Sequence, residues 1–300
     1  MALPADPAKI AKILPPMVDN TRLVDGNHQP LRVVMRDPAG NETLVGPATA
    51  VDALTRINVM AYDYAGAAWQ TFTRHHAPLF GYAGPSGDPG PASLTRFNAH
   101  YAMQAYRYVH DDYIGNGFDP DDPLASSPLA EIPAAKLTLG IPTYGRAFGS
   151  VDAGSYDGYP GLFQFTDDST RRRVPKGTYD GGKWGNSGVF AYWDILLNHG
   201  GDAEAPAGNL QVVEPGGVPY GPYVLEGDLF IGFDDAVQVA IKVDYVVDSG
   251  FGGVMFWDLP SDLSAVQVDQ GLPGAAAAYP DASLVERIAA AFELRSPRAP

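Results

Sequence analysis

Three short apolar runs along the chain each lead into polar or aromatic residues. They cover Arg56–Asp63, Lys136–Pro142 and Gly252–Trp257. Short runs that are apolar and rich in β-branched residues are typical of strands buried in a parallel sheet. Polar residues follow at Thr143–Arg146 and Asp258–Asp262, and the first run itself ends in Tyr-Asp. The pattern predicts three parallel strands with polar side chains at their carboxyl ends.

Helical periodicity alternates with these strands. Apolar residues recur at near-helical spacing over Ser93–Tyr113, Asp234–Val247 and Ser283–Leu294. Asp234 and Asp235 stand where they could cap the start of the second helix. Strands and helices in alternation predict an α/β fold, with a parallel sheet and helical crossovers.

The first 50 residues do not follow this alternation. Residues 1–50 indicate an irregular leader, in which a short helix can form at Asp6–Leu14. A hairpin is expected from Leu31–Arg36 to Glu42–Val45, because two β-compatible runs flank a Pro- and Gly-containing turn.

A second interruption lies between the second and third predicted strands. Residues 149–230 are too long for one crossover and are rich in Gly and Tyr. They indicate an inserted α+β subdomain, with strands at Gly188–Trp193 and Gly227–Ile231. Residues 51–148 then carry the first two parallel strands, and residues 231–300 carry the last one with its flanking helices.

Composition excludes several classes of protein. Of 300 residues, 45% are hydrophobic and the aromatics are 4 Trp, 16 Tyr and 13 Phe, which excludes a disordered acidic chain. The 35 acidic and 20 basic side chains give a formal charge of −15. Because this charge repels phosphate backbones and anionic lipid, we expect no nucleic-acid and no membrane partner. Residues 1–16 lack the pattern of a signal peptide, and no cysteine is present for disulfides.

Two patterns suggest metal sites, and neither is complete. His75-His76 has no third ligand at suitable spacing, and adjacent side chains are expected to diverge. The acidic run Asp111–Asp122 allows a calcium-type loop starting at Asp112, but Ile114 and Pro123 stand where oxygen ligands belong. We therefore expect neither a metal nor another cofactor.

Five motifs occur in order between Met60 and Leu259. They are Met60-Ala-Tyr-Asp63 with Gly66 and Trp69, His76-Ala-Pro-Leu79, Lys136-Leu-Thr-Leu-Gly-Ile-Pro-Thr-Tyr-Gly-Arg-Ala-Phe148, Phe233-Asp-Asp235, and Gly252-Gly-Val-Met-Phe-Trp-Asp-Leu259. This series resembles glycoside hydrolase family 18, the chitinases and their non-catalytic lectin relatives. A single tetrapeptide would be weak evidence, whereas five motifs in order form a specific resemblance.

The resemblance implies a (β/α)8 TIM barrel, in which the three predicted strands are the sixth, seventh and eighth. It also implies secretion and a chitin substrate, β-1,4-linked N-acetylglucosamine, cleaved with retention through the acetamide of the sugar itself. By motif, Tyr62 would hydrogen-bond that acetamide. Asp63 and Arg146 would orient the sugar hydroxyls as a charge-assisted pair.

The resemblance further assigns an apolar floor to the site. Trp257 would form this floor, with Met60 and Tyr144 beside it, and Trp69 would stack on the sugar on the leaving side. Each assignment has a structural alternative. Either tryptophan could be a core residue, and the Asp-Arg pair could serve only as a turn cap and an ion pair.

The sequence departs from the family in the catalytic acid. Family chemistry uses a fourth-strand motif, Asp-x-x-Asp-x-Asp-x-Glu, whose glutamic acid protonates the leaving oxygen. None of the seven glutamates shows this spacing: Glu42, Glu131, Glu204, Glu214, Glu226, Glu286 and Glu293. Moreover, 56 residues precede Ile57, whereas five βα units of about 30 residues would need about 150.

We therefore expect the C-terminal part of a barrel, strands six to eight, and an incomplete barrel. Two functional hypotheses remain. The chain is either part of a chitinase-type enzyme, inactive alone because the general acid is missing, or a non-catalytic, lectin-like protein that binds chitin oligosaccharides. Open strand edges of such a sheet also predict self-association in water.

Overall fold

The structure is a computed structural model that describes residues 33–36, 42–45, 54–82, 96–109, 118–125, 128, 130–166, 173–180, 186–200, 209–262 and 283–295. The expected helix at Asp6–Leu14 and most of the calcium-type run lie outside these residues. The expected hairpin is confirmed, because β1 (Val33–Arg36) pairs antiparallel with β2 (Glu42–Val45).

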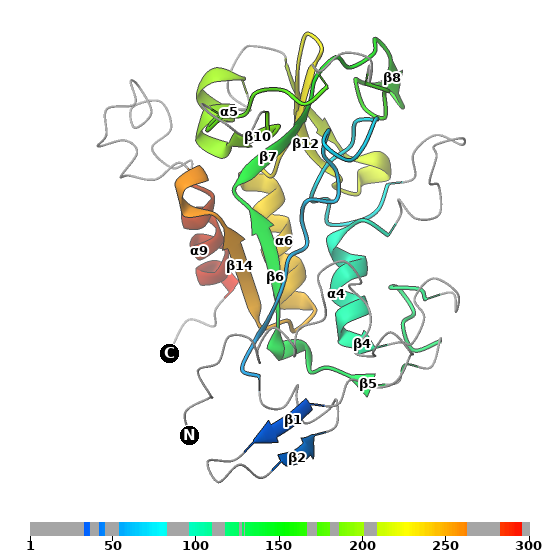
Figure 1. Cartoon of the computed structure of the whole chain (residues 1–300), viewed down its shortest axis with the longest axis vertical. Helices are drawn as coiled ribbons and strands as arrows, with labels where there is room; N and C mark the ends of the chain where they lie inside the picture. The colour runs from blue at the N-terminus through cyan, green and yellow to red at the C-terminus, as the bar shows by residue number, and fades with distance from the viewer. Residues whose placement is uncertain are drawn as a thin grey trace.

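A three-stranded parallel sheet carries the three predicted strands (Figure 1). Its central strand is β6 (Leu137–Pro142), which pairs with β3 (Ile57–Val59) on one side and β14 (Gly253–Trp257) on the other. All six residues of β6 are buried, as its apolar run predicts. β3 is shorter than expected, since the chain turns after Val59 and Ala61 N–H donates to the Val59 carbonyl at 2.9 Å.

Three helices pack on this sheet, as the periodicity predicts. α6 (Ala236–Asp248) and α9 (Leu284–Arg295) pack together beside β14, and α4 (Ala99–Arg107) lies on the opposite side of α6 (Figure 1). Buried residues of β6 belong to two hydrophobic clusters. Ile141 packs in the cluster that includes residues of α6 and α9, and Leu139 packs in the cluster that includes residues of α4. The parallel sheet with helical crossovers is therefore confirmed.

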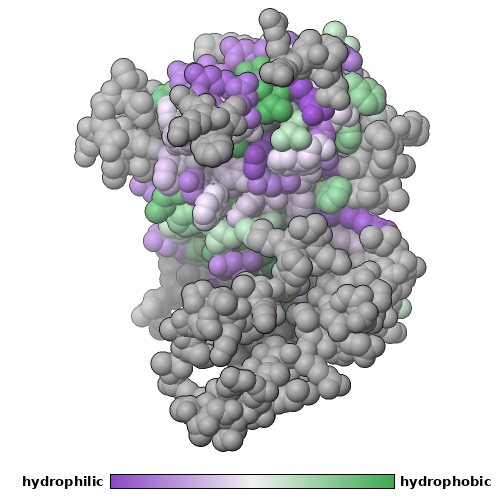
Figure 2. All heavy atoms as spheres, in the orientation of Figure 1, coloured by the Kyte–Doolittle hydropathy of each residue, from purple (hydrophilic) through white to green (hydrophobic). Residues whose placement is uncertain are grey.

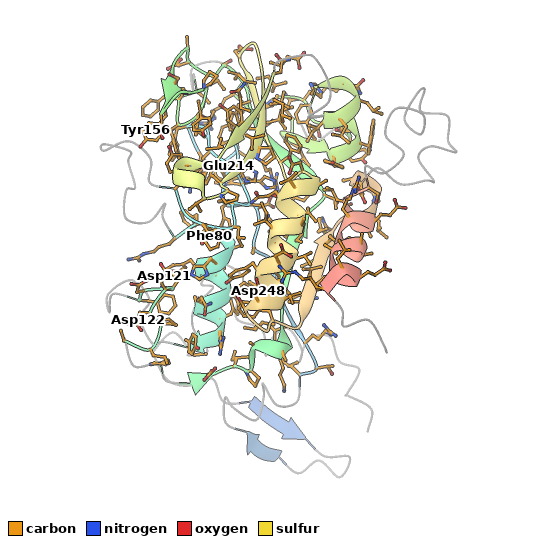
Figure 3. All side chains as sticks on the ribbon, turned by 180° about the vertical axis from the view of Figure 1, so that it is seen from behind. Phe80, Asp121, Asp122, Tyr156, Glu214 and Asp248 are labelled. Atoms are coloured by element: carbon orange, nitrogen blue, oxygen red, sulfur yellow. The ribbon has the colours of Figure 1, made fainter. Side chains whose placement is uncertain are left out.

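The first helix differs from its predicted bounds. It begins after Asn98, whose side chain accepts from Tyr101 N–H at 2.8 Å, and it ends at Arg107. The next residues form β4 (Tyr108–Val109), which pairs with β5 (Ala130–Glu131). Figure 3 shows Phe80 and Asp121 near this helix. The rings of His100 and Phe80 have centroids 5.5 Å apart, and His100 Nε2 lies 3.2 Å from Asp121 Oδ1.

The inserted segment contains a five-stranded antiparallel sheet, in the order β10-β7-β13-β12-β11. Its strands are β7 (Tyr144–Phe148), β10 (Val189–Ala191), β11 (Leu210–Val213), β12 (Gly221–Glu226) and β13 (Leu229–Gly232). Because β7 follows β6 after only Thr143, this sheet begins before residue 149, earlier than expected. The predicted strand at Gly188–Trp193 is wrong in its second half, where α5 (Tyr192–Asn198) begins.

Short elements complete the described chain. They are β8 (Ser155–Tyr156), β9 (Tyr159–Pro160) and three 3-10 turns at Ala134–Lys136, Pro215–Gly217 and Leu259–Ser261. No helix in the described segments is both long and apolar enough to cross a membrane.

A buried ion pair joins α6 to the segment that follows β3. Asp235 caps the helix by accepting from Gln238 N–H at 2.7 Å, whereas Asp234, also expected as a cap, pairs with Lys242 instead. The Lys242 ammonium also donates to the Ala77 carbonyl at 2.7 Å, and neither charged side chain is exposed. Buried charges of this kind are tolerated only when they are paired and hydrogen-bonded.

Removing one partner should therefore be costly. We expect Lys242→Met to lower the free energy of unfolding by about 3–5 kcal/mol, because it leaves Asp234 buried without its cation. Urea denaturation measures this change. The control Lys176→Met, at an exposed lysine, should change it by no more than about 0.5 kcal/mol. The double variant with Asp234→Leu should regain most of the loss, and equal losses in the single and control variants would contradict the argument.

Candidate functional site

The carboxyl ends of the three parallel strands lie along one edge of the sheet and bring the predicted residues together. Trp257 stands opposite Pro142 in the register of β14 and β6, and Val59 stands opposite Leu139. Thr143 fastens the edge, since its N–H donates to the Trp257 carbonyl at 2.9 Å. The Trp257–Asp258 peptide bond is cis.

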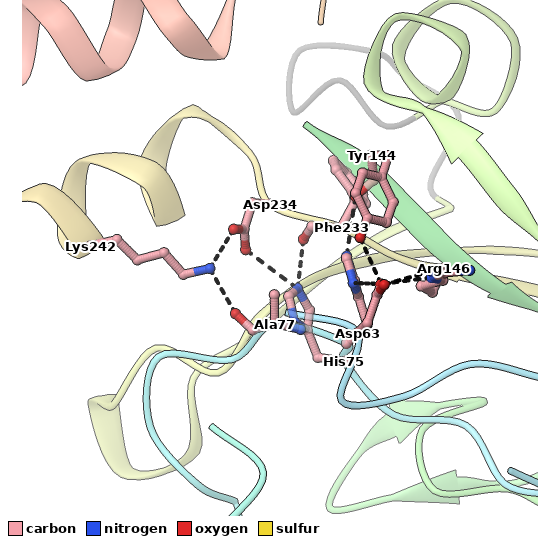
Figure 4. A network of polar contacts seen from close by, with 9 residues as sticks. Asp63, His75, Ala77, Tyr144, Arg146, Phe233, Asp234 and Lys242 are labelled. Atoms are coloured by element: carbon pink, nitrogen blue, oxygen red, sulfur yellow. Dashed lines mark hydrogen bonds and ion pairs between the residues drawn. The ribbon is translucent and has the colours of Figure 1, made fainter. Parts of the chain in front are cut away.

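An ion pair between Asp63 and Arg146 is the centre of this edge (Figure 4). Arg146 donates from Nε to Asp63 Oδ1 at 2.7 Å and from Nη2 to Oδ2 at 2.6 Å, a bidentate geometry. The Tyr144 hydroxyl donates to the same Oδ1 at 2.7 Å. The side chains remain 34% exposed at Asp63 and 17% at Arg146, so the pair is held by the protein and still reaches solvent.

Backbone conformation and electrostatics both constrain Asp63. Its φ of 63° is left-handed, a conformation that costs energy for any residue but glycine and is often found at functional sites. Burial alone would raise the pKa of Asp63, but the two hydrogen bonds and the charge of Arg146, aided by the nearby His76, outweigh burial and lower that pKa well below its usual range. The carboxylate is therefore ionised at neutral pH.

Two tyrosines stay protonated around this carboxylate. Burial, aided by the negative charge of Asp63, raises the pKa of Tyr62 to about 12. The same two causes raise the pKa of Tyr144. The rings meet edge to face, with centroids 6.2 Å apart. Both hydroxyls can therefore donate hydrogen bonds at neutral pH.

Two buried histidines lie beneath the pair, and their rings stack with centroids 5.7 Å apart. His75 Nδ1 accepts from Ala77 N–H at 3.0 Å, and its Nε2 donates to the Phe233 carbonyl at 2.6 Å. His76 Nε2 lies 3.1 Å from the Tyr144 carbonyl, which can only accept. Burial, the largest cause, lowers the pKa of both histidines, so both are neutral at pH 7.

The network continues from His75 to the buried ion pair (Figure 4). Asp234 Oδ1 lies 3.9 Å from His75 Nε2, and the other carboxylate oxygen of Asp234 contacts Lys242. Burial raises the pKa of Asp234 and lowers that of Lys242, and their mutual attraction opposes both shifts. Polar contacts thus run from α6 to His75, whose ring stacks on His76 beside the surface pair.

Exposed apolar side chains also lie at this edge, one of them against Arg146 and two at strand ends. The exposed fraction is 50% for Trp69, 60% for Trp257 and 43% for Met60. The Arg146 guanidinium lies over the Trp69 ring, 5.1 Å from its centroid. Polar and apolar side chains are interspersed on the upper part of the face in Figure 2. Neither tryptophan is a core residue, which removes that alternative for both.

Two glycines make room for these side chains. A Cβ at Gly66 would lie 2.6 Å from the Trp69 ring, and one at Gly140 would lie 2.6 Å from the Val59 carbonyl and 2.8 Å from the Tyr62 ring. Sequence reasoning named Gly66 in a motif without a role and missed the contact of Gly140. Only Gly at this position of β6 leaves space for Tyr62.

The histidine pair does not form part of a metal cluster in the described residues, where no group of three or more His, Cys, Asp or Glu side chains could hold a metal ion. The expectation that adjacent side chains diverge is wrong for His75 and His76, because the backbone carbonyls of Phe233, just after β13, and Tyr144, on β7, hold the rings in a stack. Sequence reasoning also missed the path to Lys242, which joins residues far apart in the chain.

The edge can bind a neutral ligand that has both hydroxyl groups and an apolar face. Carboxylate, guanidinium and phenol groups provide charge-assisted acceptors and donors, and the tryptophan faces provide flat apolar surface. This combination is typical of carbohydrate-active proteins. The family model of glycosyl hydrolases family 18 matches residues 29–262, and the chain belongs to this family.

Comparison with known proteins supports this assignment. Chitinase A1 of Niallia circulans is 31% identical over 225 residues, which are 75% of this chain and 26% of that protein. Chitinase ChiA74 from Bacillus thuringiensis is 26% identical in sequence with a TM-score of 0.52, over 72% of this chain and 29% of that chain. Human YKL-39, described as a pseudo-chitinase with retained chitooligosaccharide binding properties, shares the fold with a TM-score of 0.52 at 21% identity, over 82% and 52% of the two chains.

The match covers less than half of the length of the chitinases compared next. The chain spans 26% of the length of Chitinase A1 and 42% of Chitinase B of Serratia marcescens. The family is built on a TIM barrel, whereas no sheet closes on itself among the residues described in this chain.

The lowered pKa of His75 predicts a pH dependence of stability. An unfolded histidine titrates near pH ~6.5, so the unfolded chain takes up a proton below that pH and the folded chain does not. The contribution of His75 to the free energy of unfolding is then fully present above about pH 6.5. It decreases as the pH falls toward the pKa of His75 in the folded state. Relative to His75→Gln, the wild type should lose up to about 1.4 kcal/mol per pH unit below pH ~6.5.

Urea denaturation of both proteins at several pH values checks this result. Between pH ~7.5 and 8.5 the two stabilities should run parallel, because neither state of His75 takes up a proton there. A constant difference down to pH ~5 would show that the buried ring exerts no such effect.

Proposed function

We propose that this chain binds β-1,4-linked N-acetylglucosamine chains at the carboxyl edge of its parallel sheet, as the sugar-holding part of a chitinase-type site. The observation that carries the proposal is the bidentate Asp63–Arg146 pair, with exposed Trp69 against Arg146 and exposed Trp257 at the same edge of the sheet. Sugars present hydroxyl edges to such pairs and apolar faces to such rings. Membership of family 18 supports this substrate class.

The family resemblance gives the sheet its proposed place in the barrel, where β3, β6 and β14 would be strands six, seven and eight. Their parallel pairing side by side in chain order, with an insertion after β6, is compatible with this place. The chain would then form the C-terminal part of the family barrel. The extracellular place of action that the family resemblance implies belongs to the same proposal.

The family resemblance assigns individual roles, and the geometry is compatible with them. Tyr62, protonated at neutral pH, would donate to the acetamide of the bound sugar, while Asp63 and Arg146 orient its hydroxyls. Trp257 would form the floor, beside Met60 and Tyr144. Trp69, fixed under the Arg146 guanidinium, would stack on the next sugar.

The position of the glutamates favours binding without cleavage for this chain alone. Five glutamate side chains are described: Glu131, Glu214, Glu226, Glu286 and Glu293. Two of them make ion pairs elsewhere, Glu131 with Arg107 and Glu226 with His199. None of the five lies in the segment directly after the end of β3, β6 or β14. The second candidate function, chitin cleavage with retention through the acetamide, needs a proton donor that these residues do not supply at this edge.

Sugar binding can be tested by titrating chitotriose while following tryptophan fluorescence. We expect saturable quenching with an affinity near the millimolar range or somewhat better. Trp257→Ala should weaken binding about tenfold or more, since the indole face accounts for about 1.4 kcal/mol or more of apolar burial. The control Trp193→Phe, on α5, should retain the wild-type affinity. An equal loss in both variants would contradict the assigned floor.

Cleavage can be tested by release of a chromophore from a chitobioside. The pure chain should release it no faster than background, because a missing general acid costs about a hundred- to ten-thousand-fold in rate. Release above background by the wild type that disappears in Asp63→Asn would refute the non-catalytic assignment. Quenching without release supports the binding function.

A further inference from the structure

The imidazole of His76 lies beside the Asp63–Arg146 ion pair, and its two ring nitrogens have different surroundings. Its Nδ1 is buried 3.7 Å from Asp63 Oδ1 and has no hydrogen-bond partner among the described residues. Its Nε2 faces the Tyr144 carbonyl at 3.1 Å. Because a carbonyl oxygen can only accept, the Nε2 of His76 must carry the hydrogen. The neutral ring therefore points the lone pair of Nδ1 toward a carboxylate, which also offers only lone pairs.

The neighbouring histidine cannot relieve this contact. His75 accepts at Nδ1 from Ala77 N–H and donates from Nε2 to the Phe233 carbonyl, so two backbone groups fix it as the neutral ring. A proton on His75 Nδ1 would break the first of these bonds. Nδ1 of His76 is thus the nitrogen of this stacked pair that can gain a proton and a partner in one step.

We propose that His76 is a positioning residue that takes up one proton at Nδ1 and then holds Asp63 for ligand binding through an added charge-assisted hydrogen bond. The proposal rests on the proposed sugar-binding function for its ligand. Asp63 itself remains the group that touches the sugar, and His76 acts through it.

The charged groups around His76 set the sign of the effect. Asp63, after β3, and Asp234, before α6, attract a proton to His76, whereas Arg146 on β7 repels it. Burial lowers the pKa of His76, so the ring is neutral at pH 7 and gains its proton only in acid. Lys242 on α6 pairs with Asp234 and reduces the attraction from that side.

A bound sugar should strengthen proton uptake. Asp63 is 34% exposed, and a ligand over it excludes the water that screens its charge. The attraction between Asp63 and a proton on His76 then increases. By reciprocity, the chain with His76 protonated must bind the sugar more tightly than the chain with His76 neutral, by the same factor. We expect the affinity to rise about fivefold as the pH falls through the His76 transition.

The first experiment needs no ligand. Nitrogen-15 NMR of the histidine rings in the full chain, from neutral pH to the onset of acid unfolding, should show His76 Nδ1 gaining a proton in one step. The carboxyl carbon of Asp63 should shift with the same midpoint, and Asp63→Asn should move that midpoint to lower pH because the attracting charge is gone. A His76 ring that stays neutral, or an Asp63 signal that does not follow it, overturns the proposal.

The second experiment measures chitotriose affinity against pH in three proteins. His76→Asn places a permanent N–H near the Nδ1 position, so it should bind at the tighter level at all pH values. His76→Leu has no donor and should bind at the weaker level at all pH values, whereas the wild type moves between these levels. A wild-type pH profile retained in both variants overturns the proposal.

The two experiments separate this inference from the proposed function. If no protein binds chitotriose at any pH, sugar binding is refuted. The ligand-free NMR result still decides whether His76 takes up a proton at Nδ1 and then donates a hydrogen bond to Asp63. A purely structural role of His76 would change stability in the variants without changing the pH at which Asp63 responds.

Discussion

The ion pair between Asp63 and Arg146 is the interaction on which the rest of the site depends. Asp63 follows a strand of the parallel sheet, and Arg146 lies on the first strand of the antiparallel insert, so one bidentate contact joins the two sheets. A salt bridge in water contributes little, but partial burial and fixed geometry strengthen this one. The contact also sets the guanidinium over Trp69, which couples the polar centre of the edge to its apolar flank.

A second ion pair, between Lys242 and Asp234, is fully buried and lies beside His75. Between the two pairs lie two neutral imidazoles, each held by a backbone carbonyl. This order keeps the two carboxylates apart and leaves each beside its own cation, which limits the cost of burying four charges. It also means that the carboxyl edge is built from residues of β3, β7 and α6, and no local segment could form it alone.

Local patterns predicted the parts of the fold that depend on local periodicity. The three parallel strands, α6, α9 and the β1–β2 hairpin follow from apolar runs and caps within single segments. The end of β3 depends on a local turn and the start of α4 on a side-chain cap, neither of which apolar periodicity encodes. The switch from β10 to α5 coincides with a tertiary hydrogen bond from Tyr192 N–H to the Thr143 carbonyl. In the site, motifs placed Asp63 and Arg146 at the same edge. The stack of His75 on His76 and the pairing of Asp234 with Lys242 needed the folded chain. The backbone partners of His76, His75 and Lys242 are 68, 158 and 165 residues away, and the pairing of Asp234 competes with a helix cap.

Holding a sugar and cleaving it place different demands on this edge. The groups proposed to orient the ligand, such as Asp63, Arg146 and Trp257, would contact it before and during any reaction and would therefore contribute to ground-state affinity. A general acid contributes mainly when the leaving oxygen develops charge, so it adds rate with little affinity. An edge that retains the first set and has no glutamate among its described residues can therefore keep its affinity for the sugar and have no turnover. The same separation explains how one family scaffold can support both chitinases and pseudo-chitinases that retain binding.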